Sequence, residues 1–440
     1  MRKPWNREKI GHSLSEVYAS ISIPKNSGFW KKLFAFLGPG LMIAVGYMDP
    51  GNWATDIAGG AQFGYTLLSA ILISNIFAII LQHLSLKLGI VTERDLAQAC
   101  RDHFSPRVNF VLWIFCEIAI AACDLAEVIG SAIALNLLFG IPLTWGIVIT
   151  TLDVLLILLL QAKGFRWIER IIGGFIFIIF ACFFYEVVIS KPEIFPLLKG
   201  LVPQKEVVTN PSILYIAIGI LGATVMPHNL YLHSSIIQTR NYEKSDNGKR
   251  EAIKFATIDS SASLFLAFFI NAAILIVAAA TFHTSGNHNV ADINDAYEML
   301  TPLLGTGFAS VAFAIALLAS GQNSTITGTL AGQIVMEGFL NIKLKPWLRR
   351  LITRLIAVIP AFVVTLFYGE KGTSELLVLS QVILSMQLSF AVVPLVMFTG
   401  DKLKMGVFVN KPWLKILAWA ITLLIIILNI YLLYQTLSGN

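Results

Sequence analysis

The stretch Gly46-Tyr47-Met48-Asp49-Pro50-Gly51-Asn52 interrupts the first long apolar segment of this chain, and Gly222-Ala223-Thr224-Val225-Met226-Pro227-His228-Asn229 interrupts the sixth. Proline removes a backbone donor and clashes with the preceding turn, and glycine destabilises a helix. Each stretch therefore predicts unwound backbone between two half-helices. Such backbone persists inside a membrane only where it lines a cavity or is buried in protein. One proline alone would be as consistent with a kinked, packed helix, but two breaks with polar neighbours favour a binding site.

The composition around these breaks is typical of an integral membrane protein. Of the 440 residues, 56% are hydrophobic and 13% are charged, and the mean hydropathy is +0.74. The apolar residues run in blocks of roughly 18 to 25, the length that a helix needs to cross about 30 Å of hydrocarbon. Eleven blocks are predicted spans: 34–60, 67–89, 108–139, 143–161, 171–190, 212–238, 256–282, 303–322, 351–368, 374–399 and 413–437.

The basic residues predict the orientation, because loops rich in Lys and Arg stay in the cytoplasm. The N-terminus and every second connection after it hold 28 of the 32 Lys and Arg residues, and the opposite side holds 4. We therefore expect a multi-pass protein of the cell membrane with a cytoplasmic N-terminus and an extracellular C-terminus. The net charge of +6 then reflects topology and not a nucleic-acid surface.

The two breaks fall in spans one and six, at equivalent places in two successive groups of five. Paired broken helices of this kind are typical of secondary transporters built from inverted repeats, with the binding site at the bilayer midplane. The expected organisation is an all-α integral membrane fold. Its parts are a flexible cytoplasmic leader (1–33), a first five-helix repeat (34–190), an extracellular linker (191–211), a second five-helix repeat (212–399), and a cytoplasmic loop with an eleventh helix (400–440). The cysteines Cys100, Cys116, Cys123 and Cys182 lie in or beside spans and predict no disulfide.

The residues at the breaks suggest a metal ion. A carboxylate at the bilayer centre costs on the order of 3 kcal/mol, so Asp49 needs a cation or a functional cavity. Asn52 adds an amide oxygen, Met226 a thioether, and the unwound backbone free carbonyls, for which Gly46 and Ala223 are the best candidates. Mg²⁺ and Ca²⁺ prefer oxygen ligands throughout, whereas sulfur favours later or softer ions. The set indicates Mn²⁺ or Fe²⁺, without ranking them, and Co²⁺, Zn²⁺ or Cd²⁺ as tolerated ions; a methionine that merely packs is the alternative for Met226.

Three motifs together resemble the Nramp family of divalent-metal transporters, in its bacterial manganese-importer branch. They are Asp49-Pro50-Gly51-Asn52, Met226-Pro227-His228, and the segment from Gly321 to Leu340. The resemblance extends over essentially the whole chain. It implies a LeuT-like fold of 5+5 helices plus an eleventh, and metal import with protons by alternating access. The metal would be a transported substrate and not a cofactor, and no obligate protein partner is implied.

The same resemblance assigns candidate ligands. Asp49, Asn52, Met226 and the carbonyl of Ala223 match the metal ligands of the family. A glutamine of span ten joins them in some states, and Gln381 is a better candidate here than Gln387. This chain has Ser389 where the family commonly has proline, which leaves the backbone of that span open.

A second set of polar residues runs along span three. Glu117, Asp124 and Glu127 lie within about 80° of arc on one helical face. Acidic residues and histidines inside membranes commonly relay protons, and static ion pairs are the alternative. Candidate partners that resemble the proton route of the family are His228, His233, Arg240 and Arg354. His228 could carry a proton or orient the break by hydrogen bonding.

A pair of histidines, His283 and His288, lies in a predicted outside loop. Their spacing suggests metal capture, although two histidines in a polar loop are more often simply solvated.

Other functions fit the sequence less well. A carrier of an organic solute on the same fold seldom places an acid and a thioether at its centre, and Met226 disfavours an oxygen-ligand Mg²⁺ carrier. A membrane enzyme or ATP-driven pump is disfavoured because the sequence has no phosphate-binding loop, no zinc-protease motif and no sizeable soluble region. A receptor or scaffold would not need a midplane carboxylate.

Overall fold

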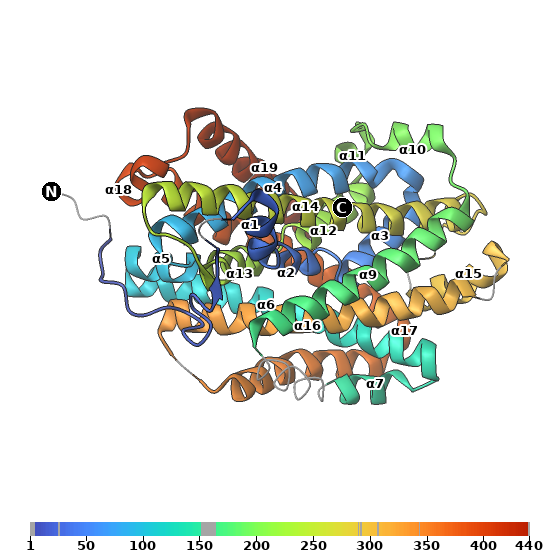
Figure 1. The fold of residues 1–440 in the computed structure, drawn as a ribbon. Coiled ribbons are helices and arrows are strands. Elements are labelled where there is room, and N and C mark those ends of the chain that lie inside the picture. The colour runs from blue at the N-terminus through green and yellow to red at the C-terminus, as the bar shows by residue number, and fades with distance from the viewer. Residues whose placement is uncertain are drawn as a thin grey trace.

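The computed structural model describes residues 5–24, 27–150, 164–288, 290, 293–305, 308–342 and 344–438. This part of the chain is mostly helical, and many of the long helices run along one common direction (Figure 1). In chain order the elements are β1 (Ile21–Ser22), α1 (Phe29–Phe36), α2 (Pro39–Gly46), α3 (Pro50–Phe63), η1 (Gly64–Leu67), α4 (Leu68–Thr92), α5 (Leu96–His103), α6 (Pro106–Phe139), α7 (Leu143–Thr150), α9 (Phe165–Ser190), α10 (Ile194–Gly200), α11 (Glu206–Thr209), α12 (Pro211–Thr224), α13 (Pro227–Ile236), η2 (Ile237–Thr239), β2 (Arg240–Asn241), α14 (Asp246–Ala278), η3 (Ala279–His283), α15 (Ile293–Leu304), α16 (Phe308–Leu340), α17 (Pro346–Thr399), α18 (Lys402–Met405), η4 (Gly406–Phe408) and α19 (Pro412–Ser438).

Eight helical segments of the described chain are long and apolar enough to cross a membrane, and a ninth results when α1 and α2, which meet at 45°, count as one span. The predicted spans nine and ten are two helices that share the label α17, and non-helical backbone at Gly369 (φ 62°) separates them. The predicted fourth span is described only through α7, and its remainder, 151–161, lies outside the described residues. The all-α membrane fold is thus confirmed, and the full number of eleven spans stays a prediction.

Both predicted breaks are present. The helix α2 ends at Gly46, and α3 begins at Pro50 with Asp49 as its N-cap residue. The helix α12 ends at Thr224, and α13 begins at Pro227 with Met226 as its N-cap residue. Each proline occupies the first position of its half-helix, where a missing N–H costs nothing because that donor has no intrahelical partner.

The half-helices pair in the manner of an inverted repeat. The second half of the first broken span, α3, packs against the first half of the other, α12, and α2 packs against α13. This pairing requires the two broken spans to run in opposite directions. The helices α6 and α17 also contact both α3 and α13, so the two breaks are enclosed by packed helices.

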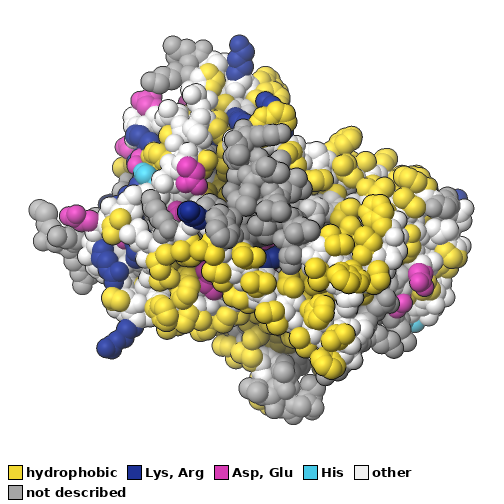
Figure 2. All heavy atoms as spheres, turned by 90° about the horizontal axis from the view of Figure 1, so that it is seen from below, with side chains coloured by type: hydrophobic (Ala, Val, Ile, Leu, Met, Phe, Trp, Pro, Cys, Tyr) yellow, Lys and Arg dark blue, Asp and Glu magenta, His cyan; other side chains and the backbone are white. Residues whose placement is uncertain are grey.

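Apolar and charged side chains are distributed unevenly over the surface. Hydrophobic side chains cover much of the middle of the face seen in Figure 2. The Lys and Arg side chains visible there lie more in its left half and at its top than at its right, and the N-terminus lies at the left in Figure 1.

The prediction of a flexible N-terminal leader is wrong for residues 5–24, which pack across one end of the helices. Strand β1 pairs in parallel with β2, which follows the second broken span. The Leu14 N–H donates to Glu337 Oε2 (3.1 Å), and the ring of Trp5 lies 5.7 Å from that of Phe398. Leu14 is only 3% exposed. The leader therefore ties α13, α16 and α17 together at one end of the fold.

Candidate metal site

Asp49 is placed by its role as a helix cap. Its Oδ1 accepts a hydrogen bond from the Asn52 N–H (2.8 Å), and both side chains are buried. An acidic N-cap is favourable because the helix N-terminus carries partial positive charge and unpaired donors. The other oxygen, Oδ2, lies 4.0 Å from Cys123 Sγ on α6. One carboxylate oxygen thus fixes the half-helix while the other faces α6.

The two prolines determine which carbonyls are free. In an α-helix the carbonyl of residue i accepts from the N–H of residue i+4. Pro50 stands four residues after Gly46, and Pro227 stands four residues after Ala223. Because proline has no N–H, the carbonyls of Gly46 and Ala223 both lack their helical donor. These are the two carbonyls that the sequence nominates as ligands.

The other carbonyls of the first break already have donors. The Tyr47 carbonyl accepts from Asn271 Nδ2 (2.7 Å), and the Met48 carbonyl accepts from Trp53 Nε1 (3.2 Å). These bonds hold the unwound backbone against α14 and α3, so it is fixed without using the carbonyl of Gly46.

Met226 and Asp49 meet the same residue of α6. Met226 is fully buried in a small apolar cluster with Cys123 and Leu384. Cys123 Sγ also lies 4.0 Å from Asp49 Oδ2, so Cys123 belongs to the cluster of Met226 and also neighbours the Asp49 carboxylate. The two breaks thus have a common neighbour on α6.

Gln381 of α17 lies between the two breaks. A Cβ added to Gly51 would overlap its side-chain amide, and one added to Gly222 would overlap its backbone carbonyl. The Oε1 atom of Gln381 and the Oδ1 atom of Asn52 are buried without a hydrogen-bond partner. Buried oxygens of this kind normally have a partner, and a cation would supply one for both. The Oε1 atom of Gln387 also lacks a hydrogen-bond partner, but only Gln381 is shown to lie against Gly51 and Gly222 among the described residues.

The donor set differs from that of a structural metal centre. Across the described ranges, no group of three or more His, Cys, Asp or Glu side chains is arranged to hold a metal ion. One carboxylate, two amide oxygens, two free carbonyls and one thioether remain at the breaks. Such a shell fits an ion that binds and leaves better than one held permanently by several charged ligands.

The three acidic residues of α6 lie in two separate places. A Cβ added to Gly328 of α16 would lie 2.9 Å from Glu127 Oε1 and 3.4 Å from Asp124 Oδ1, so both carboxylates face the same point of α16. Glu117 lies two turns away and accepts from Trp113 Nε1 (3.0 Å). The structure therefore joins Asp124 and Glu127 and sets Glu117 apart.

Glu127 links the break to Arg354. Its Oε1 lies 3.6 Å from Cys123 Sγ, and its Oε2 accepts from Thr325 Oγ1 (3.1 Å) and lies 3.4 Å from Arg354 Nη1. A line of polar atoms thus runs from Asp49 through Cys123 and Glu127 to Arg354, entirely inside the protein.

The two histidines of α13 have different surroundings. His228 is buried, its Nδ1 atom has no hydrogen-bond partner, and it interacts electrostatically with Asp124. His233 Nδ1 lies 2.9 Å from Gln82 Oε1, and Gln82 Nε2 donates to the Tyr47 hydroxyl (2.9 Å). His233 therefore reaches the first break by a separate hydrogen-bonded route.

Arg240 does not join this network. Its Nη1 donates to Glu169 Oε1 (2.7 Å), and its Nη2 donates to the carbonyl of Leu37 (2.8 Å). These contacts brace the bend between α1 and α2, and they give Arg240 a structural role at the end of the fold.

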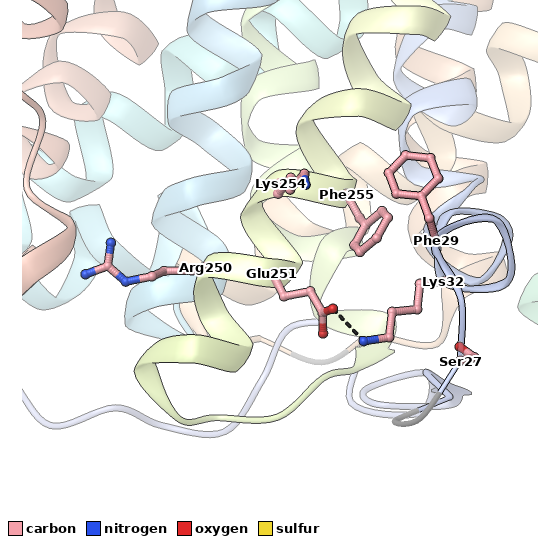
Figure 3. A pocket seen from close by; sticks show the side chains of 7 residues that line it. All are labelled: Ser27, Phe29, Lys32, Arg250, Glu251, Lys254 and Phe255. Carbon is pink, nitrogen blue, oxygen red and sulfur yellow. Dashed lines mark hydrogen bonds and ion pairs between the residues drawn. The ribbon is translucent and has the colours of Figure 1, made fainter.

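A cavity of about 450 Å³ lies away from the breaks, between α1 and α14. Figure 3 shows Lys32 reaching Glu251 across it, while Arg250 points away from this pair. The charged groups here do not converge on one point, so this cavity is a poor candidate for the metal site.

Cys123 is the contact that sequence reasoning missed. The sequence offers a signal for it, because Cys123 directly precedes Asp124 and stands one helical turn before Glu127. That spacing places its thiol on the acidic face of α6.

Comparisons with known proteins show the family of this chain. Residues 40–435 match the family model described as Natural resistance-associated macrophage protein-like (Nramp). A protein of Listeria innocua named divalent metal cation transporter MntH is 65% identical over 438 residues, covering 100% of this chain and 98% of that protein. The manganese transporter of Eremococcus coleocola superposes with a TM-score of 0.89 at 44% identity, covering 95% of this chain and 90% of the other.

A more distant likeness concerns the fold alone. Mhp1, a nucleobase-cation-symport-1 family transporter, has a TM-score of 0.62 at 16% identity and covers 90% of this chain and 91% of its own. These likenesses confirm the expected LeuT-like architecture.

Proposed function

Because this chain belongs to the Nramp family, as a multi-pass membrane transporter of divalent metal cations and not an enzyme, we propose that its cargo is Mn²⁺ or Fe²⁺, bound between the two helix breaks. The proposed ligands are Asp49, Asn52, Met226, Gln381 and the carbonyls of Gly46 and Ala223. The observation that supports this proposal is that Cys123 lies 4.0 Å from Asp49 Oδ2 and belongs to the buried cluster that contains Met226.

The chemistry of these donors favours the proposed ions over the alternatives. The single carboxylate provides the charge that attracts a dication, and the buried amide oxygens of Asn52 and Gln381 replace part of its hydration shell. The thioether disfavours Mg²⁺ and Ca²⁺, which prefer oxygen. A carrier of organic solutes would need a larger space and a half-helix N-terminus aimed at the solute.

Protons are the proposed coupling ion. Asp124 and Glu127 provide titratable groups beside the metal site, Cys123 lies between Glu127 and Asp49, and His228 interacts with Asp124. In this proposal Glu127 and Asp124 take up protons as the metal binds or leaves, and Arg354 sets the charge of Glu127. Glu117 and His233 are proposed for the outlying parts of the route.

The proposed orientation follows the basic residues. The end of the fold that carries the N-terminal leader and most Lys and Arg residues faces the cytoplasm, and the C-terminus lies outside. The proposed repeats are 34–190 and 212–399. In alternating access, the site between the two breaks opens to one side of the membrane and then to the other.

The experiment is uptake into liposomes that contain the purified protein. Mn²⁺ and Fe²⁺ should enter saturably and acidify the interior in the presence of an inward proton gradient, and Asp49→Ala should abolish metal entry. Asp259→Asn is a matched control, since Asp259 is a buried acid of α14 that accepts from the Gly40 N–H away from the breaks. Undiminished Mn²⁺ uptake by Asp49→Ala would reject the proposed site, and uptake without acidification would reject proton coupling.

A further inference from the structure

The two histidines noted in the sequence meet the far end of α3. His283 Nδ1 lies 3.0 Å from the carbonyl oxygen of Ala61, His288 Nδ1 lies 3.4 Å from the same oxygen, and the two Nδ1 atoms are 3.2 Å apart. Three polar atoms from α3, from η3 and from the loop after it therefore form a small triangle.

Hydrogen bonds alone cannot account for all three contacts among these atoms. A neutral imidazole has either a proton or a lone pair at Nδ1, and the carbonyl oxygen only accepts. If both Nδ1 atoms donate to Ala61, two N–H groups face each other; if one donates to the other, a lone pair faces the carbonyl oxygen. At most two of the three close contacts are hydrogen bonds at one time.

A metal ion satisfies all three contacts at once. Bonds of about 2.0 to 2.1 Å to nitrogen place neighbouring ligand atoms about 2.9 Å apart in an octahedral shell and about 3.4 Å apart in a tetrahedral one. The distances of 3.0, 3.2 and 3.4 Å fall in this interval. Imidazole nitrogen is a good ligand for Zn²⁺, Co²⁺ and Ni²⁺.

The surroundings favour a cation. Ala61 lies in the last turn of α3, where carbonyls lack helical partners and the helix carries partial negative charge. A cavity of about 360 Å³ adjoins His288 and is lined also by Asp295 and Glu298, which add negative charge to this end of the protein. Water can complete the shell, because the described residues place no third His, Cys, Asp or Glu side chain in a ligating position here.

We propose that His283, His288 and the Ala61 carbonyl form a second binding site for a divalent transition-metal ion of the imidazole-favouring kind. It is separate from the breaks, since the 12 residues from Asp49 to Ala61 span about 18 Å of helix. In the proposed orientation it lies at the extracellular mouth. Its existence does not depend on the proposed transport site.

The test is Co²⁺ titration of the purified protein without a histidine tag, followed by the visible absorption of bound Co²⁺ and by calorimetry. The Asp49→Ala variant removes the break site and should still bind one Co²⁺. Adding His288→Ala to this variant should weaken that binding at least tenfold, and adding His283→Ala should do the same. His288 is exposed, so its replacement leaves the fold intact. The His283 ring packs against Gly64, so the His288 variant is the cleaner test.

The matched control is Asn287→Ala, which changes the neighbouring loop residue whose amide donates to Ser285 Oγ and should leave Co²⁺ binding unchanged. Equal Co²⁺ affinity in Asp49→Ala and Asp49→Ala/His288→Ala would overturn the second site. If instead the wild type and Asp49→Ala bind the same single Co²⁺ and His288→Ala loses it, the second site stands and the break site fails.

Discussion

The guanidinium of Arg354 lies 3.4 Å from the carboxylate of Glu127, and neither side chain is exposed. The two residues stand on α17 and α6, and Thr325 of α16 donates to the same carboxylate oxygen. A buried ion pair whose members also have other hydrogen bonds costs much less than either charge alone. The pair and Thr325 therefore join three helices beside the proposed metal site. The charge of Glu127 depends on how all three helices pack.

Replacing Glu127 with Gln should destabilise the protein and weaken proton coupling. The variant leaves Arg354 buried without its anion, and breaking a buried pair costs about 3 to 5 kcal/mol. Thermal unfolding in detergent and liposome acidification measure the two effects. Glu117→Gln is the control on the same helix, because Glu117 is less buried and accepts from Trp113, so its unfolding temperature should change little. An unfolding temperature of Glu127→Gln equal to that of the wild type would contradict the structural role of the pair.

Met226→Ala should change ion selectivity more than Mn²⁺ transport. The variant removes the thioether but keeps the Asp49 charge, so Mn²⁺ uptake should persist while the exclusion of Ca²⁺ and Mg²⁺ weakens. Competition of each ion with Mn²⁺ in liposomes measures this. Leu384→Ala truncates another side chain of the same apolar cluster without removing a ligand, and it should leave the exclusion of Ca²⁺ intact. Unchanged Ca²⁺ exclusion in Met226→Ala would show that the thioether does not select the ion.

The sequence predicts those parts of the site that depend on local chemistry. Glycine and proline mark where α2 and α12 end, because they act on the backbone within a few residues. The same proline spacing explains why Gly46 and Ala223 have free carbonyls.

The remaining features arise from contacts between distant segments. Glu169 pairs with Arg240 across 71 positions, and Leu14 meets Glu337 across 323. No local pattern encodes such partners, so the sequence predicts neither the ion pair of Arg240 nor the packing of the leader. The position of Gln381 beside Gly51 likewise depends on how α17 packs.

Gly51→Ala should impair metal binding by displacing Gln381. The added methyl group would overlap the Gln381 amide, which is held between the two breaks. Mn²⁺ affinity, measured by calorimetry, should fall at least tenfold. Gly173→Ala is the control, since a Cβ there meets no atom within 4 Å and alanine favours a helix. The double variant Gly51→Ala/Gln381→Ala should recover the wild-type unfolding temperature, because it removes the overlap; if it stays as unstable as Gly51→Ala, another contact limits Gly51.

Asp95 provides a pH-dependent contribution to stability outside the membrane spans. It is the N-cap residue of α5, accepts from the Gln98 N–H (2.8 Å), and is fully buried. Burial raises the pKa of Asp95 from 3.8 to about 6, although its hydrogen bonds oppose this shift. A pKa raised on folding means that the folded protein binds the proton more tightly than the unfolded chain. The stability from this group is thus complete below about pH 4 and is lost as the pH rises through about 6.

The variant Asp95→Asn keeps a capping side chain and removes the charge. Relative to the wild type, its free energy of unfolding should increase between pH 4 and pH 7 by up to roughly 3 kcal/mol, because a shift of about two pKa units corresponds to that energy. Denaturant unfolding at several pH values measures it. Asp401→Asn, at the N-cap of α18, is the control with the opposite sign. Burial raises the pKa of Asp401, but the hydrogen bonds from Lys404 and the Leu403 N–H and the positive charge of Lys404 together lower it below its usual value. Asp401→Asn should lose stability relative to the wild type as the pH rises from acid. Parallel pH profiles for Asp95→Asn and the wild type would contradict the raised pKa of Asp95.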